Sequence, residues 1–335
     1  MRDCQLHSRI YIITVIYNRQ IDEIRSLPEF QILMDRHPGV GLIVADNSTD
    51  ANVLERNRRT AAESGWLIYE AAVENNGTIH QTPPPGSDEA IHQTTSAPGS
   101  GQMIYLECGG NVGLSRAYNK ALAAIPKDEA YWVMLSDDDT EFSLEYLENG
   151  CRQIERQALR TGTSTTSRKD DRNAGRESLR VLCGVVLTGR GWISPRSEHA
   201  KELAFSQVLR KPKPGIYRDL YPINSGLFLE GSAIREVGGF DERLFLDQVD
   251  FLMMDRLRAR GIRRIGVLPG EIRQAFSGEV GAGTGTVQSS DKRWKIFRKD
   301  FETYCDLTNK PWYYRAYILG RRWLMLGMQQ VMRGR

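Results

Sequence analysis

Three consecutive aspartates, Asp137, Asp138 and Asp139, close a hydrophobic stretch at residues 130–136 that is typical of a buried strand. Side chains two positions apart in an extended chain point the same way, so Asp137 and Asp139 would face one ion while Asp138 turns aside. Carboxylates of this kind suit Mg²⁺ or Mn²⁺, which retain waters and share phosphate oxygens. The alternative is a solvated acidic turn that caps a helix starting near Ser143.

A second pair of carboxylates, Asp247 and Asp250, falls in residues 245–260, where the spacing predicts a helix that Gly261 stops. Residues three apart on a helix are neighbours, and two close carboxylates raise each other's pKa, which suits one of them to act as a general base. The alternative is that both acids complement the dipole at the N-terminus of the helix.

Two polar segments follow other predicted strands. In residues 46–50, the carboxylate of Asp46 can accept hydrogen bonds from a base or a ribose; an Asx turn with an N-cap for the next helix is the alternative. Residues 109–119 join a strand to a helix, with glycines that allow close backbone approach and a helix N-terminus that favours an anion. This segment is not GxGxxG, so a Rossmann dinucleotide fingerprint is missing, and a plain strand-to-helix turn remains the alternative.

Strands and helices alternate through the first half of the chain. This alternation predicts βαβ units and a mainly parallel sheet with both faces covered. Strands are expected at residues 10–17, 40–45, 66–71, 103–107, 131–136, 179–187, 225–229 and 263–267, and helices at 21–36, 52–64, 114–124, 232–237 and 245–260. Residues 73–101 and 161–177 are polar and lack an apolar period, so we expect mobile surface insertions there.

The bulk composition excludes several classes of protein. The chain has 335 residues, 40% of them hydrophobic, which is enough for one large core or two modest ones. A net charge of +3 gives no reason to expect a nucleic-acid partner. Five widely spread cysteines without a CxxC pair favour a reducing cytosol over a disulfide framework or a zinc site. The start lacks a signal-peptide pattern, so a cytoplasmic protein is expected.

The last 45 residues differ from the rest in charge. Residues 291–335 contain eleven Lys and Arg against four Asp and Glu, and Pro311 can open a helix. The polar positions Arg315, Arg322, Gln329 and Arg333 recur at helical spacing and share a face. Residues 311–335 therefore fit a basic amphipathic helix that touches an anionic membrane surface. The alternative is a helix that packs on the rest of the protein with a solvated arginine stripe.

Five short segments, taken in order, resemble family 2 glycosyltransferases with the GT-A fold, over about residues 10–270. Their positions are Ile13–Arg19 (opening strand and nucleotide-contacting loop), Val44–Asp50 (second base-binding loop), Asn111–Asn119 (N-x-G-x-x-x-A-x-N), Asp137–Asp139 (DXD metal motif) and Gly238–Phe245 with Asp247-Gln-Val-Asp250 (G-G-F-D-E-x-x-F…D-x-x-D). The D-x-x-D form is similar to rhamnosyltransferase-like and galactofuranosyltransferase-like members. The resemblance implies a GT-A domain at residues 1–290, with residues 291–335 as a basic helical extension.

The resemblance also implies an activity: inverting, metal-dependent transfer of a sugar from a nucleotide-diphosphate sugar to a saccharide or lipid-linked saccharide acceptor, in surface polysaccharide synthesis. Asp250 matches the family's catalytic base, and Asp137 with Asp139 would hold Mg²⁺ or Mn²⁺. The implied donor-binding residues are Tyr17, Asn18, Arg19, Asp46, Asn47, Asn111, Gly113, Arg116, Asp137 and Asp138. The implied acceptor-binding residues are Asn224, Ser225, Gly226 and Asp247. With a lipid-linked acceptor, the enzyme would be peripheral at the inner face of the membrane.

One departure from the family pattern and two rival functions stay open. Many relatives carry a histidine some 20–30 residues after the base, but residues 269–278 have none; the third ligand is therefore unassigned among Glu271, Arg273, Gln274 and Ser277. A sugar-phosphate nucleotidyltransferase would open with a Gly-rich loop, which residues 18–19 lack. An inactive carbohydrate-binding module would not need the three acids Asp137, Asp139 and Asp250 together.

Overall fold

The computed structural model describes residues 8–71, 79–81, 101–126, 130–162, 178–189, 191–197, 211–274 and 290–333. The predicted insertions at 73–101 and 161–177 lie almost wholly outside these residues. The parts of them that are described depart from the prediction of irregular insertions: residues 79–81 form a strand, and residues 161–162 belong to the end of a long helix. Strand 79–81 pairs with the strand before it, because that edge of the sheet offers unpaired backbone groups.

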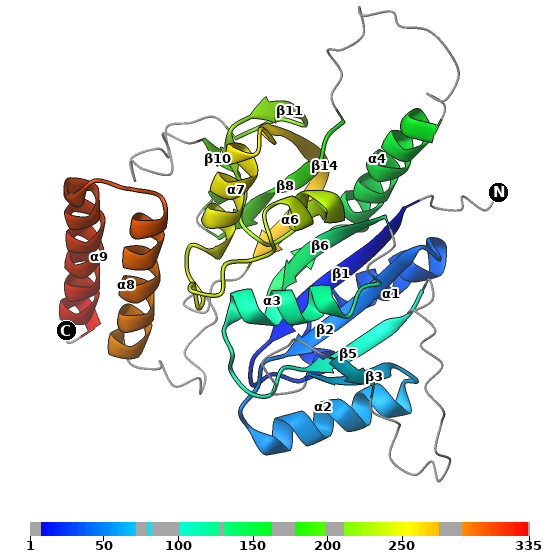
Figure 1. Cartoon of the computed structure of the whole chain (residues 1–335). Coiled ribbons are helices and arrows are strands. Elements are labelled where there is room, and N and C mark those ends of the chain that lie inside the picture. The colour runs from blue at the N-terminus through cyan, green and yellow to red at the C-terminus, as the bar shows by residue number, and fades with distance from the viewer. Residues whose placement is uncertain are drawn as a thin grey trace, which may run out of the picture.

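A mixed sheet of twelve strands forms the centre of the molecule (Figure 1). Ten of its strands follow the order β11-β14-β8-β13-β6-β1-β2-β5-β3-β4, while β7 pairs with β14 and β9 with β8. The strands are β1 Arg9–Ile16, β2 Val40–Asp46, β3 Leu67–Ala71, β4 Ile79–Gln81, β5 Met103–Glu107, β6 Tyr131–Asp137, β7 Thr140–Phe142, β8 Val181–Thr188, β9 Gly191–Ser194, β11 Gly215–Arg218, β13 Leu227–Glu230 and β14 Arg264–Gln274. A separate pair joins β10 Arg196–Ser197 to β12 Leu220–Tyr221.

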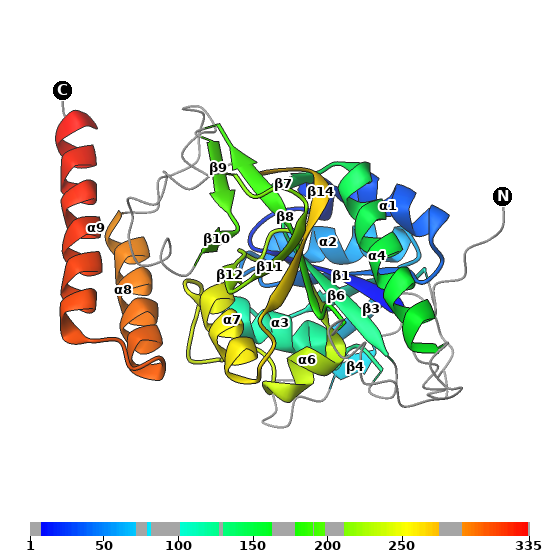
Figure 2. The same cartoon turned by 90° about the horizontal axis from the view of Figure 1, so that it is seen from above.

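Helices cover both faces of this sheet (Figure 2). They are η1 Ile21–Glu23, α1 Leu27–Arg36, α2 Ala51–Glu63, α3 Leu114–Ala123, α4 Leu144–Gly162, α6 Gly231–Glu236, α7 Val249–Ala259, α8 Ser290–Leu307 and α9 Trp312–Arg333. One buried apolar cluster joins the sheet to α3, α6, α7 and α8, and a second joins the opposite face to α1, α2 and α4. The predicted α/β class, with a mostly parallel sheet between helices, is confirmed.

In the parallel half of the sheet, the carboxyl ends of three neighbouring strands lie side by side. β1 lies between β2 and β6, and its last residues pair in register with the acids that end those two strands: Ile16 with Asp46, and Val15 with Asp137. The chain reaches β2 first and crosses to β6 later, so a topological switch point lies at β1. In open α/β sheets, ligands bind in the crevice outside the carboxyl ends of the strands at such a point.

Some predicted boundaries are wrong for identifiable reasons. The helix predicted at 245–260 begins only at Val249, because Gln248 takes a left-handed conformation with φ 65°. The helix predicted at 21–36 is split into η1 and α1, with Pro28 in the first turn of α1. The strand predicted at 263–267 continues as β14 to Gln274, with a bulge in its pairing between Val267 and Glu271.

The C-terminal helices α8 and α9 lie beside each other and beside α7 (Figures 1 and 2). Phe297, Phe301 and Tyr304 of α8 are buried in the same apolar cluster as α7, so this part of the extension packs on the sheet-bearing body. Within the described residues, none of the helices has the length and apolar character needed to cross a membrane.

The alternative prediction for α9 was a helix packed on the protein with a row of arginines exposed to solvent. Arg315 and Arg322 do not lie in such a row. Arg315 pairs with Asp306 of α8 at 2.5 Å, and the Arg322 guanidinium lies 3.6 Å from the centre of the Phe297 ring. Both interactions draw the cations toward α8. The large apolar side chains are exposed instead: Trp312, Tyr313, Tyr317, Trp323 and Leu324. The side chains of Gln329 and Arg333 lie outside the described residues.

Candidate active site

The carboxylates of Asp137 and Asp139 meet at one amide group. Asp137 is the last residue of β6, and Asp139 lies in the turn before β7. The Nε2 of Gln274, at the end of β14, donates to Asp137 Oδ2 at 2.9 Å and to Asp139 Oδ1 at 3.3 Å. Ser225 also donates its hydroxyl to Asp137 Oδ2. The two acids thus point to the same place, as the spacing of two predicts.

Asp138 faces away from this meeting point and toward Arg19, whose Nε lies 3.3 Å from Asp138 Oδ2. Burial raises the pKa of all three carboxyl groups, for Asp138 to about 6 against the opposing effect of Arg19. Ser225 and Gln274 oppose the rise at Asp137, and Gln274 opposes it at Asp139. Ionised carboxylates therefore cost free energy here, and a bound cation would remove that cost.

The donor set fits a hard divalent cation only with oxygen atoms beyond the two carboxylates. Among the described residues, no three His, Cys, Asp or Glu side chains gather closely enough to hold a metal ion. Gln274 supplies a further candidate, because its Oε1 is buried and has no hydrogen-bond partner. Turning the amide by half a rotation would place this oxygen beside both carboxylates, where the N–H group now lies. Mg²⁺ and Mn²⁺ commonly complete such a set with waters and phosphate oxygens.

The loops after β1 and β2 are tied together by hydrogen bonds. Asn18, at a positive φ of 48°, donates its backbone N–H to Ser48 Oγ at 2.8 Å. Its side-chain oxygen accepts from the backbone of Thr49 and Asp50, at 2.9 and 3.1 Å. Tyr17, the first residue after β1, is exposed at this edge of the sheet. Residues 17–19 therefore lie against the loop that follows β2.

Asp46 is buried and its carboxylate is occupied by protein groups. Its Oδ1 accepts from the backbone of Ser48 at 2.9 Å, which makes the Asx turn, and its Oδ2 accepts from Asn57 and from the Tyr105 hydroxyl, both at 2.8 Å. Burial and this carboxylate raise the pKa of the Tyr105 phenol. In this structure Asp46 shapes the loop and offers no exposed oxygen to a ribose or base.

The segment from Asn111 to Gly113 contacts the same loop. Asn47 donates through Nδ2 to Asn111 Oδ1 at 3.1 Å, and its own Oδ1 accepts from the Val112 backbone at 2.8 Å. Gly113 has a φ of 89°, and a Cβ there would lie 2.6 Å from the Phe245 ring. Only glycine fits this approach, and it brings the start of α3 against the loop before α7.

The N-terminus of α3 is partly filled by the protein itself. The Phe245 carbonyl accepts from the Leu114 N–H at 2.6 Å, so one of the helix's unpaired donors is already used. Arg116 is exposed and pairs with Glu242 at 3.4 Å. Asn119 holds the same turn, because it donates to the Phe240 carbonyl and accepts from the Phe240 N–H, both at 2.9 Å. Arg116, an implied donor-binding residue, is therefore an exposed arginine that an ion pair holds at the surface.

Asp250 lies in the first turn of α7. Its Oδ1 accepts from the Phe251 N–H at 2.8 Å. Tyr118 of α3 is fully buried and its hydroxyl has no hydrogen-bond partner. Burial, followed by the charges of Asp137 and Asp250, raises the pKa of this phenol. Acids from β6 and α7, far apart in the sequence, therefore act on one buried group.

Asp247 does not share a helix face with Asp250, which corrects the prediction. It precedes α7 and forms a two-pronged ion pair with Arg293 of α8, in which Nη2 lies 2.8 Å from Oδ1. The buried carboxylate of Asp300 accepts from the backbone N–H groups of residues 245, 246 and 247, at 2.9, 2.7 and 2.8 Å. These bonds hold the segment in an irregular conformation, so the helix cannot begin earlier.

The predicted acceptor segment 224–226 contacts the aspartate cluster through Ser225. Ser225 donates to Asp137 and accepts from the Thr140 hydroxyl at 3.2 Å. Gly226 donates its N–H to the Leu135 carbonyl at 2.9 Å and accepts from the Tyr146 hydroxyl. Asn224 is buried, and its Oδ1 is without a hydrogen-bond partner. Of these three residues, Asn224 alone offers an unused polar atom to a ligand.

Tyr118 and Asp300 are site residues that the sequence analysis missed. Asp300 had a usable signal: it lies among Phe297, Phe301 and Tyr304, on the apolar face of a helix, where an unpaired acid would be costly. Tyr118 had none, because a tyrosine on the inner face of a helix is an ordinary core residue. Gln274 was one of four candidates, of which Ser277 lies outside the described residues.

Comparison with known proteins gives one sequence match and a set of distant structures. Residues 82–210 match the model of Glycosyl transferase family 2, a range that contains Asp137–Asp139 but neither Asp46 nor Asp250. No curated protein matches the sequence. With the α/β fold, the family match supports a glycosyltransferase.

Two solved glycosyltransferases illustrate the structural likeness. GalNAc-T7 with UDP, GalNAc and Mn²⁺ is 11% identical with a TM-score of 0.49, covering 89% of this chain and 48% of its own. TarS from S. aureus is 13% identical with a TM-score of 0.44, covering 87% of this chain and 38% of its own. This chain thus spans about half or less of the length of these two proteins.

Proposed function

We propose that this protein is an inverting glycosyltransferase that moves a sugar from a nucleotide-diphosphate sugar to a saccharide or lipid-linked saccharide acceptor. The observation that carries the proposal is that Asp137 and Asp139 meet at the Gln274 amide, where the parallel strands β1, β2 and β6 end. The family match over residues 82–210 supports the class of reaction. A single displacement uses a base near the acceptor hydroxyl and a positive group, such as a cation held by carboxylates, near the leaving diphosphate.

Asp250 is the proposed catalytic base. It removes the proton from the acceptor hydroxyl as that oxygen attacks the anomeric carbon, and the nucleoside diphosphate leaves from the opposite side. The first turn of a helix stabilises the ionised form, which the base must have at the start of the step. Asp247 is held by Arg293, so any contact it makes with acceptor hydroxyls would be shared with that guanidinium.

Asp137, Asp139 and Gln274 are the proposed residues that hold the divalent cation, either Mg²⁺ or Mn²⁺. When bound, the cation neutralises the charge that builds on the leaving diphosphate. The amide N–H of Gln274 donates to both carboxylates and so places this side chain at the proposed cation site. Gln274, through its unpartnered Oε1, would be the third ligand at the place where many relatives have a histidine. Asp138 and Arg19 would lie beside the diphosphate.

The donor nucleotide is proposed to bind over the three loops that follow β1, β2 and β5. Tyr17 is exposed there and can stack on a base. Asn18, Asn47 and Asn111 tie these loops to one another, which sets their shape before the nucleotide arrives. Asp46 acts through the loop that it holds. Sugar-phosphate nucleotidyl transfer remains the alternative enzymatic reading.

A thermal-shift panel of UDP-, dTDP- and GDP-sugars, with and without Mn²⁺, tests this function. We expect one nucleotide to raise the Tm, and Mn²⁺ to increase that shift. Metal-dependent hydrolysis of the same sugars without acceptor then separates the classes. A glycosyltransferase releases nucleoside diphosphate slowly, a nucleotidyltransferase does not, and a binding module releases nothing. No shift with any of the three nucleotides would contradict the proposal.

We also propose that the exposed side of α9 contacts an anionic membrane surface. Trp312 and Trp323 are 78% and 65% exposed, and Tyr313, Tyr317 and Leu324 of the same helix are also exposed. The helix carries four arginines and no acidic residue, so its net positive charge attracts anionic lipid at a distance even though Arg315 and Arg322 face α8. Tryptophan and tyrosine favour the interface between lipid and water, where their rings are apolar and their tips polar.

Replacing both tryptophans tests this contact in the full chain. We expect Trp312→Ser with Trp323→Ser to lower the affinity for phosphatidylglycerol-containing vesicles about tenfold or more in a sedimentation assay, since two large apolar side chains no longer insert. Ile32→Ser, which removes an exposed apolar side chain on α1, is the matched control and should pellet like the wild type. Equal pelleting of all three proteins would refute the contact, as would dimerisation through α9 in the absence of lipid.

A further inference from the structure

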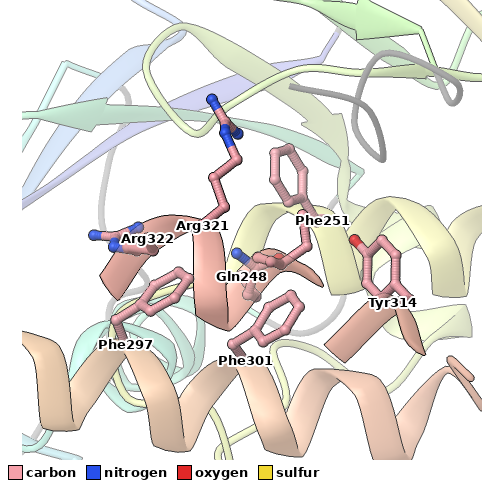
Figure 3. A pocket seen from close by; sticks show the side chains of 8 residues that line it. Gln248, Phe251, Phe297, Phe301, Tyr314, Arg321 and Arg322 are labelled. Carbon is pink, nitrogen blue, oxygen red and sulfur yellow. The ribbon is translucent and has the colours of Figure 1, made fainter. Parts of the chain in front are cut away.

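A cavity of about 170 Å³ lies where α7, α8 and α9 meet (Figure 3). Its walls are largely aromatic: Phe251 from α7, Phe297 and Phe301 from α8, and Tyr314 from α9. Its polar groups include Arg321 and Arg322 of α9. Small-molecule sites typically combine such apolar walls with a few placed polar groups.

The cavity adjoins the first turn of α7, which carries the proposed base. Gln248 and Phe251 both line it, and Asp250 lies between them in the sequence. The left-handed conformation of Gln248 begins the helix at this place and fixes the direction in which these side chains leave the backbone. A molecule that fills the cavity therefore contacts the start of α7 through Gln248 and Phe251, the two residues that flank Val249 and the proposed base Asp250 in the sequence.

Positive charge gathers at the cavity with little to balance it. Within the part of the chain that the structure describes, no carboxylate pairs with Arg321. In Figure 3 the Arg321 side chain extends away from α9 on the side where Phe251 lies, whereas Arg322 turns toward Phe297. Burial lowers the pKa of Arg196 on β10, and the charge of Arg321 lowers it further.

Asp247, the carboxylate that acts on Arg322, is already paired with Arg293. Burial lowers the pKa of Arg322, Asp247 opposes the effect, and Arg293 adds to it. Asp247 is itself bound through both oxygens by Arg293. Half-buried guanidinium groups without a paired anion are costly, and an oxyanion ligand would satisfy them with charge-assisted, two-pronged hydrogen bonds.

We propose that this cavity is an acceptor subsite for a saccharide that carries an oxyanion, a phosphate or a carboxylate. The aromatic walls take the apolar face of a sugar ring, and Arg321 with Arg322 binds the anionic group. This inference rests on the proposed glycosyl transfer and specifies its acceptor. It also gives the C-terminal helices a role in substrate choice, because two walls of the subsite come from α8 and α9.

Calorimetric titration of the full-length protein with glucose 6-phosphate, glucuronate and glucose tests the subsite. We expect the wild type to bind one of the two anionic sugars at least about tenfold more tightly than glucose, since each charge-assisted pair adds substantial binding free energy. A preference between glucose 6-phosphate and glucuronate tells phosphate from carboxylate. Equal affinity for all three sugars would overturn the proposal.

Variants of Arg321 assign the effect to this cavity. Arg321→Gln should weaken binding of the anionic sugar about tenfold, and Arg321→Lys should retain part of it, because lysine keeps the charge but lacks the planar fork. Arg156→Gln removes an exposed arginine from α4, on another flank of the molecule, and should bind like the wild type. Unchanged binding in Arg321→Gln would refute the assignment.

Nucleotide binding, measured on the same wild-type sample with Mn²⁺, separates the acceptor-subsite proposal from the proposed glycosyltransferase function on which it rests. Nucleotide binding without any preference for an anionic sugar would remove the subsite and leave the glycosyltransferase function standing. A preference for the anionic sugar without nucleotide binding would instead contradict the function. Thermal melts of each variant show whether a loss of binding reflects a loss of fold.

Discussion

Replacing Asp250 by asparagine is expected to lower the rate of sugar transfer by about 10²–10⁴-fold, the range that positioned proton transfer contributes. Asparagine has the same size and keeps an oxygen that can accept the Phe251 N–H, but it cannot take a proton at neutral pH. Binding of the nucleotide with Mn²⁺ should persist, because the proposed cation ligands Asp137 and Asp139 are untouched. Steady-state kinetics measure the rate of sugar transfer, and calorimetry on the same protein measures nucleotide binding.

The outcome of this experiment separates a base from a binding group. If Asp250 served only to bind the acceptor, KM would rise while kcat stayed close to that of the wild type. Asp35→Asn, which changes an exposed carboxylate on α1, is the matched control and should leave both constants unchanged. Full activity in Asp250→Asn would refute the base assignment.

The sequence predicted the sheet well because its central strands are continuous apolar runs with polar residues directly after them. Residues 10–17, 40–45 and 131–136 were predicted as buried strands of a parallel sheet, and the acids that end the last two do lie at the same ends of neighbouring strands. The period of two also placed Asp137 and Asp139 on one side. These features depend on local sequence alone.

The errors arose where distant residues decide the backbone. Asp300 lies 53 positions beyond Asp247 and still determines that 245–247 stays out of the helix. β14 continues past Pro269 and Gly270 through a bulge, and so delivers Gln274 to Asp137, 137 positions earlier in the chain. Proline and glycine together usually end a strand, so the local pattern pointed to a loop. The sequence marks Asp300 and Gln274 as candidates at most, and it does not indicate which distant residues they contact.

Buried polar atoms without partners are a further feature that no sequence pattern shows. Tyr118 and Asn224 each have such an atom, and so does Gln274. Such atoms are costly in a finished core, and native proteins keep few of them. Two of these residues act at the aspartate cluster, Gln274 through its amide and Tyr118 through the charge of Asp137. The cost is understandable if a ligand supplies the missing partners.

The carboxylates of the aspartate cluster should therefore lower the stability of the fold and raise its affinity for a cation. Asp139→Asn tests both effects. Burial raises the pKa of Asp139 above its usual value, so the ionised form destabilises the fold once the pH exceeds the pKa of the unfolded chain. At neutral pH and without metal, the neutral asparagine should raise the Tm. We expect the same variant to lose Mn²⁺ affinity by at least about 100-fold, because a direct ligand matters more than the outer contacts that cost 10–100-fold.

Electron paramagnetic resonance of Mn²⁺ measures the affinity, and thermal melts in chelator measure the stability. Asp138→Asn is the matched neighbour: its carboxylate faces Arg19, so its Mn²⁺ affinity should stay within about threefold of the wild type. A lower Tm for Asp139→Asn in chelator would mean that the carboxylate supports the fold, as an ordinary acidic turn would. Unchanged Mn²⁺ binding would remove the cation from this edge of the sheet. A variant with a higher Tm in chelator and a lower affinity for Mn²⁺ would show that the carboxylate binds the cation and destabilises the fold.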